Sequence, residues 1–155
     1  MAGTWKADAG LIDVEFTNGA KIAAGFAVAP KEMRAELRKS HTQTAKEAQK
    51  WIRSGAQQGT PQQRHMGNAI QGRGNSTQAI IAIVPTKKTA GAQGTFYGAK
   101  QFKQFPTWVG NTWTPGVSGQ GPYVINPVLA ARQNDLDVIF LEGQAQAVAR
   151  AVPRF

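Results

Sequence analysis

A long apolar stripe with helical spacing is the feature of this sequence that most restricts its fold. Apolar or small side chains recur at steps of three and four residues, at Met33, Leu37, His41, Thr44, Ala45, Ala48 and Ile52. Pro30 precedes the stripe, and Lys31 and Glu32 occupy the expected first turn. This period predicts a helix over residues 31–54 with one buried face, ended by Gly55.

A second helical pattern fills the C-terminal part of the chain. Asn126 and Pro127 are typical of an N-cap and a first helical position. The expected buried stripe comprises Leu129, Leu136, Ile139, Phe140, Ala147, Val148 and Ala151. Gly143 is expected to bend this helix and Pro153 to stop it.

The clearest strand is AIIAIVP, residues 79–85, which is apolar on both faces and is therefore expected in the centre of a sheet. Residues 11–16 predict a short strand, with a turn at Asn18-Gly19 and a return strand over residues 21–28. The polar residues 55–77 predict a loop, within which residues 67–70 are expected to start a short strand. PTKKTAGAQG, residues 85–94, predicts a basic, flexible loop.

These elements together predict one α+β domain over residues 11–155, preceded by a flexible arm over residues 1–10. We expect a small, mostly antiparallel sheet with two long helices packed on one face and long loops between the elements.

The positive charge is concentrated in the middle of the chain. The net charge is +9, yet no aspartate or glutamate occurs between Glu47 and Asp135. Such an acid-free interval favours contact with polyanions or with acidic protein surfaces.

Residues suited to catalysis are scarce. The chain has no cysteine and two histidines, of which His41 falls on the apolar stripe and His65 in a polar segment. The neighbouring carboxylates, Glu32 with Glu36 and Asp135 with Asp137, are expected on helix surfaces, and Gly72-Arg73-Gly74-Asn75 in a tight turn. We therefore predict a protein that is not an enzyme and that needs no metal and no cofactor.

No apolar run is long enough to span a bilayer, and the first residues lack the apolar core of a secretory signal. We therefore expect no membrane partner, and synthesis in a cytoplasm.

Residues 96–113, FYGAKQFKQFPTWVGNTW, combine aromatic side chains with lysines and contain no acid. Exposed rings beside lysines are typical of nucleic-acid platforms and also of protein docking surfaces. The simpler interpretation is that Phe96, Phe102 and Phe105 are core residues, and at least half of them are expected to be. Trp108 and Trp113 lie among Gly, Thr and Pro, and are expected on the surface or against a second subunit.

These residues also carry a family resemblance. The stretch 96–113, then GPYVINP at 121–127, then a long helix ending in Ala151-Val152-Pro153 resembles the C-terminal half of head–tail joining proteins of long-tailed phages, the neck or tail-completion family. The basic, alanine-containing first helix is similar to the N-terminal helix of that family. The likeness covers about residues 26–153.

The resemblance implies a structural virion protein at the neck, made in the host cytoplasm and assembled as a hexameric ring between the portal and head-completion proteins and the tail tube. For such a ring we expect subunit or ring–ring contacts at Phe105, Trp108, Trp113 and Tyr123. Contacts with an acidic partner, or non-specific contacts with double-stranded DNA in the channel, are expected at Arg73, Lys87, Lys88, Lys100 and Lys103.

Two alternatives stay open at this point. One is a tail terminator that caps the tail tube, which belongs to the same structural class. The other is a single-stranded nucleic-acid-binding protein, for which the purified monomer should bind oligonucleotides tightly and with strong salt dependence.

Overall fold

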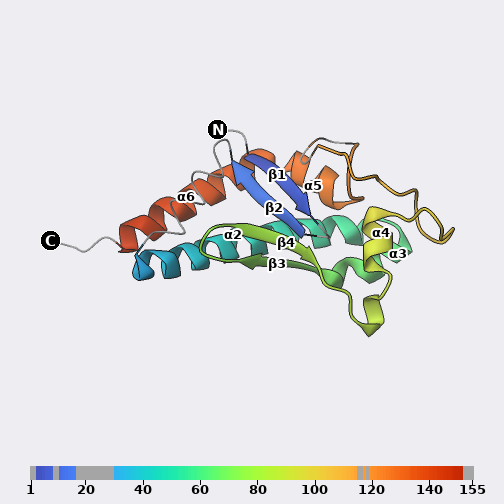
Figure 1. The fold of residues 1–155 in the computed structure, drawn as a ribbon, viewed down its shortest axis with the longest axis horizontal. Coiled ribbons are helices and arrows are strands. Elements are labelled where there is room, and N and C mark those ends of the chain that lie inside the picture. The colour runs from blue at the N-terminus through green and yellow to red at the C-terminus, as the bar shows by residue number, and fades with distance from the viewer. Residues whose placement is uncertain (1–2, 9–10, 17–29, 115–116, 118, 152–155) are drawn as a thin grey trace.

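The structure is a computed structural model, and it describes residues 3–8, 11–16, 30–114, 117 and 119–151 (Figure 1). Its elements are β1 (Gly3–Asp8), β2 (Leu11–Phe16), α2 (Lys31–Gln57), α3 (Pro61–Met66), β3 (Ile70–Gly74), β4 (Ala79–Ile83), α4 (Ala92–Tyr97), α5 (Ile125–Ala131) and α6 (Gln133–Ala151). The α+β class predicted from the sequence is confirmed. The expected turn at Asn18-Gly19, the return strand over 21–28 and the stop at Pro153 lie outside the described residues.

The four strands form one antiparallel sheet in the order β1-β2-β4-β3. Ile81 at the middle of β4 is paired with Ile12 on one side and Gly72 on the other, so the predicted central strand is confirmed. Residues 3–8, expected in a flexible arm, instead form β1 along the edge of β2. A polar segment can complete a sheet in this way because strand pairing uses backbone groups and does not require an apolar pattern.

Two glycines allow β3 to lie directly on the backbone of α2. A Cβ atom at Gly72 would lie 2.1 Å from the Ala45 carbonyl oxygen, and one at Gly74 would lie 2.2 Å from the Thr42 nitrogen. The Gly72 amide also donates to Gln49 Oε1 at 2.7 Å. The polar segment 55–77, predicted as a loop, therefore contains α3 and this strand, whose glycines obscured its character.

The first long helix confirms the predicted buried stripe, except that Met33 is only half-buried. Its predicted end at Gly55 is wrong, because α2 continues to Gln57. A Cβ atom at Gly55 would lie 2.6 Å from Val128 Cγ2, so this glycine permits close packing of α5 on α2 and does not act as a cap.

The second long helix is divided in two, which corrects the prediction of one continuous element. Helix α5 ends at Ala131 and α6 begins at Gln133, with Arg132 between them in a non-helical conformation. The N-cap is Val124, and Asn126 lies inside the helix, where its Nδ2 donates to the Val117 carbonyl at 2.9 Å and also faces the carbonyls of Thr114 and Gln120.

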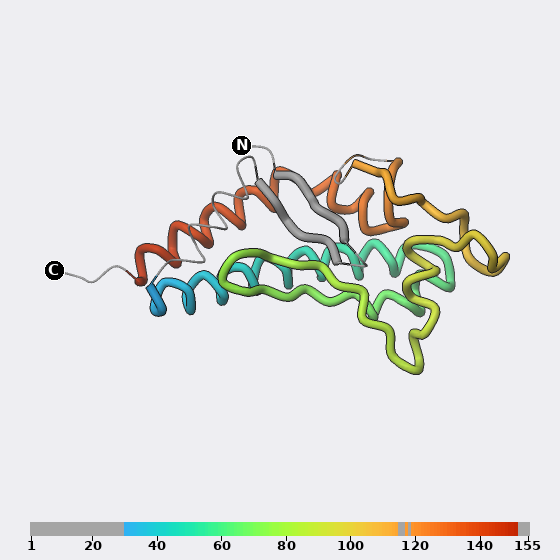
Figure 2. The backbone as a smooth tube through the Cα atoms, viewed as in Figure 1, coloured from blue at the N-terminus to red at the C-terminus, as the bar shows by residue number. Residues whose placement is uncertain are grey.

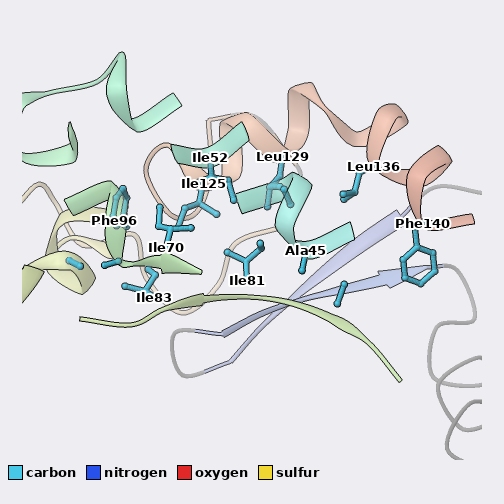
Figure 3. Packing of buried hydrophobic residues seen from close by; sticks show 14 residues of the cluster. Ala45, Ile52, Ile70, Ile81, Ile83, Phe96, Ile125, Leu129, Leu136 and Phe140 are labelled. Atoms are coloured by element: carbon cyan, nitrogen blue, oxygen red, sulfur yellow. The ribbon is translucent and has the colours of Figure 1, made fainter. Parts of the chain in front are cut away.

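The main core lies between α2, the sheet and the two C-terminal helices (Figure 3). Ile52 of α2, Ile70 and Ile81 of the sheet and Leu129 of α5 are fully or almost fully buried. Helix α6 packs mainly along α2, and a Cβ atom at Gly143 would lie 2.5 Å from Ser40 Oγ. Of the predicted α6 stripe, Leu136, Phe140 and Ala147 are buried, whereas Val148 is exposed.

The backbone is elongated (Figure 2). The free end of α6 and the first turns of α2 lie at one end of the long axis, and the segment after α4 lies at the other. The stretch predicted as a basic flexible loop over residues 85–94 holds a 3₁₀ turn at Lys87–Thr89 and the first half of α4.

Candidate functional site

The candidate site is the aromatic loop, residues 98–109, which follows α4. Its base is closed by the Ala99 amide, which donates to the Pro106 carbonyl at 3.0 Å, and by the Val109 amide, which donates to the Tyr97 carbonyl at 3.0 Å. Gly98 has a φ of 77°, and a Cβ atom there would lie 2.2 Å from the Thr107 carbonyl oxygen. A glycine is therefore required where the two arms of the loop meet.

Tyr123 braces the same loop from the segment that leads into α5. Its hydroxyl donates to the Thr107 carbonyl at 2.7 Å, and its amide donates to the Phe96 carbonyl at 2.7 Å. Phe96 is fully buried in the core. The loop is thus attached through Tyr123 to the backbone of a core residue, and its outer residues project from this hydrogen-bonded base.

The outer part of the loop forms an open pocket of about 450 Å³. Its lining residues are Ala99, Lys100, Phe102, Lys103, Phe105, Pro106, Thr107 and Trp108. Phe102 is 57% exposed and meets Phe105 edge to face, with ring centroids 6.5 Å apart. Phe105 is half-buried against α4, where a Cβ atom at Gly94 would lie 2.8 Å from its ring.

The charge at the pocket is positive. Lys100 and Lys103 are both exposed, and within the described part of the chain neither forms an ion pair. Lys100 Nζ lies 4.1 Å from the centroid of the Trp108 ring and so covers one of its faces. The pocket can accept an apolar group among the rings and a negative charge beside the two ammonium groups.

The structure gathers four of the nine predicted site residues around this pocket, namely Lys100, Lys103, Phe105 and Trp108, with Tyr123 directly behind it. Trp113 is separate, because its ring packs against Gly121, where a Cβ atom would lie 2.6 Å from the ring.

The other three basic residues are also apart from the pocket. Arg73 is exposed in β3, next to the turn between β3 and β4. Lys87 and Lys88 are exposed in the 3₁₀ turn, which is held by hydrogen bonds between Thr86 and Thr89 and by the contact of His65 Nε2 with the Lys88 carbonyl at 2.9 Å.

Sequence reasoning missed two exposed features. Phe102 was expected to share in the core with Phe96 and Phe105, but it lies at the outer edge of the pocket. On α6, Val138, Leu141 and Val148 are exposed at 52%, 42% and 37%. Their spacing of three and seven residues, with Ala145 between Leu141 and Val148, is a heptad pattern that could have indicated an outer apolar seam.

The candidate acid–base residues all have structural partners. His41 is fully buried and stacks on Phe140 with ring centroids 5.5 Å apart. Its Nδ1 lies 2.7 Å from the Asn75 carbonyl and its Nε2 lies 3.2 Å from Gln144 Nε2, which fits a neutral ring that donates at Nδ1 and accepts at Nε2. Burial lowers the pKa of His41, and the hydrogen bond to Asn75 opposes this shift.

Of the carboxylates predicted on helix surfaces, Glu36 and Asp135 form ion pairs there, whereas the expectation is wrong for Asp137, which is buried. Glu36 contacts Lys39 at 3.0 Å and Arg150 at 3.7 Å, and Asp135 contacts Arg132 at 3.2 Å. Asp137 is buried and accepts from Gln133 Nε2 at 3.1 Å. Over the described residues, no three acidic or histidine side chains gather as metal ligands would.

None of the helices in the described segments is both long and apolar enough to cross a membrane. A comparison of the chain with family models, curated proteins and solved structures found no match.

Proposed function

We propose that this chain is a structural, non-catalytic subunit of a phage head–tail connector. In this proposal, copies form a ring around the DNA channel and join the portal and head-completion proteins to the tail tube. The observation that carries the proposal is the aromatic loop, which is anchored at its base and presents an exposed phenylalanine between two lysines.

The distribution of exposed apolar side chains supports an assembly role. Exposed apolar side chains that gather on one surface favour association, whereas single exposed apolar residues are common on any protein. Here Phe102 is exposed on the aromatic loop, and Val138, Leu141 and Val148 are exposed on α6. A ring subunit needs two such surfaces, one for each neighbour.

The remaining basic residues suit non-specific contact with DNA. Arg73 is exposed on β3, and Lys87 and Lys88 are exposed side by side in the 3₁₀ turn. Scattered cations of this kind attract phosphate without recognising sequence. In a connector this would keep the genome near the channel wall while it still slides past.

The resemblance of residues 96–113 and 121–127 to neck proteins favours the neck role among the assembly roles. A tail terminator would use the same kind of ring, and it differs in its axial neighbours. The single-stranded nucleic-acid-binding alternative has one observation in its favour, the exposed Phe102 ring beside Lys100 and Lys103, on which a base could stack.

One experiment separates the assembly and nucleic-acid proposals. Native mass spectrometry of the purified chain over a range of concentrations should show a closed oligomer of fixed copy number. In parallel, a labelled single-stranded oligonucleotide should bind only weakly and without sequence preference. A chain that stays monomeric at every concentration and binds the oligonucleotide tightly at low salt would overturn the connector proposal.

A further inference from the structure

The outward side of α6 carries an apolar seam edged by acidic residues. At 100° per residue, Val138, Leu141 and Ala145 lie opposite the buried residues Leu136 and Phe140. The seam is therefore directed away from α2, and its residues repeat with the spacing of a helix that packs against a partner.

Two carboxylates flank this seam on one edge. Asp135 and Glu142 are seven residues apart, about 10 Å along the helix, and both are exposed. Within the described residues Glu142 forms no ion pair, and Asp135 has only the exposed contact with Arg132. We call Asp135, Val138, Leu141 and Glu142 the α6 outer face.

The aromatic loop presents the complementary arrangement. Lys100, Phe102 and Lys103, which we call the tip, place an exposed ring beside two exposed cations. The tip and the α6 outer face lie in opposite halves of the long axis, so they cannot meet within one subunit (Figure 1, Figure 2).

We propose that the tip of one copy docks on the α6 outer face of a second copy. Phe102 would pack on Val138 and Leu141, while the tip lysines approach Asp135 and Glu142. The contact uses different surfaces on the two copies and is therefore heterologous, so it repeats from copy to copy and closes into a ring where the rotation permits. This inference rests on the proposed connector function and assigns the subunit contact within it.

A second copy explains the observations better than nucleic acid does. A single strand could stack on Phe102 and contact the lysines, but it would leave the acidic and apolar α6 outer face without a partner. A copy of the same chain covers both surfaces at once, because each has the opposite charge of the other.

Disulfide trapping tests the contact directly, because the chain contains no cysteine and has no background reaction. Gln101→Cys chains are mixed with Ala145→Cys chains under mild oxidation, because both positions are exposed and leave the Phe102 ring, Val138 and Leu141 in place. The linked dimer is measured by non-reducing electrophoresis. The control replaces Gln101→Cys by Val117→Cys, at an exposed residue outside the tip. We expect at least about a tenfold higher yield for the Gln101→Cys mixture, because docking raises the effective concentration of the two thiols.

Charge reversal gives an independent readout. Lys100→Glu/Lys103→Glu and Asp135→Lys/Glu142→Lys should each weaken self-association by at least about tenfold. An equimolar mixture of the two variants should recover it, because the reversed charges again face opposite partners. A mixture that associates no better than either variant alone would contradict the contact.

The two proposals fail in different ways. Equal disulfide yields for the Gln101→Cys and Val117→Cys mixtures, together with a closed oligomer in native mass spectrometry, would overturn this contact and leave the connector proposal standing. Equal yields with no oligomer would overturn both.

Discussion

At the scale of single residues, His41 is a titratable side chain that is fully buried. It belongs to α2, but its ring touches the Asn75 carbonyl in the β3–β4 turn, Gln144 of α6 and the Phe140 ring. Charging a buried imidazole costs solvation energy, which is why the pKa of His41 is lowered. The residue therefore joins three elements only in its neutral form.

This environment predicts a pH dependence of stability. Because the folded chain binds this proton less readily than the unfolded chain, the contribution of His41 is fully present above the usual histidine pKa of 6.5 and is lost as the pH falls through the lowered folded pKa. Chemical denaturation from pH 8 to pH 5 should show a steeper loss of stability for the wild type than for His41→Phe.

The matched control for this experiment is His65→Gln, which changes the other histidine of the chain. His65 is exposed, with its Nε2 on the Lys88 carbonyl. The pH profile of this variant should follow that of the wild type. Identical slopes for His41→Phe and the wild type would contradict the assigned role of His41.

At the scale of elements, β3 can contact α2 closely because Gly72 and Gly74 have no side chains. With glycine at positions 72 and 74, the strand approaches the helix backbone closely enough for Gln49 to accept a hydrogen bond from the Gly72 amide. Ile70 and Ile81 then reach the core beside Ile52. A bulkier strand would have to lie farther from α2 and would leave space in that core.

Substitution of Gly72 by alanine should therefore be costly. The new methyl group would overlap the Ala45 carbonyl, and we expect the free energy of unfolding in urea to fall by about 3 kcal/mol. Gly119→Ala is the control, because φ is 83° there but no atom lies within 4 Å of a Cβ, so strain alone should cost about 1 kcal/mol. An equal loss of unfolding free energy in the two variants would show that Gly72 is not required for packing of β3 on α2.

The same glycines show how far the sequence predicts these elements. The helical period of α2 and the continuous apolar run of β4 identified both elements, because apolar residues there report burial directly. A short strand was expected to start over residues 67–70, but its course to Gly74 was missed, since Gly72 and Gly74 pack on α2 and contribute no apolar pattern. The break at Arg132 was missed because the apolar stripe continues on both sides of it.

For the molecule as a whole, the site could be predicted in part. The clustering of Lys100, Lys103, Phe105 and Trp108 follows from their closeness in sequence within one loop. The separation of Arg73 and Trp113 depends on topology, and the exposure of Phe102 depends on Phe105 occupying the space over α4. Neither can be obtained from local pattern alone.

If copies associate through these surfaces, the melting temperature should depend on protein concentration. Association that stabilises only the folded chain adds about 2.7 kcal/mol at a hundredfold excess over Kd, which corresponds to several degrees for a chain of this size. Differential scanning calorimetry over a hundredfold range of concentration should detect this rise in the wild type. At low concentration, Phe102→Ser should melt at the same temperature as the wild type. Its melting temperature should not rise with protein concentration. If it does rise, the ring of Phe102 takes no part in the association.

The anchoring of the aromatic loop has a consequence for how such a protein diversifies. Gly98, Tyr123 and the backbone bonds at the base secure the loop to the scaffold, whereas Lys100, Phe102 and Lys103 add little to the interior of their own subunit. Substitutions at these exposed positions can therefore change what the loop binds without preventing the chain from folding. A grafted tip from a divergent relative should exchange the choice of partner while the recipient keeps its native architecture.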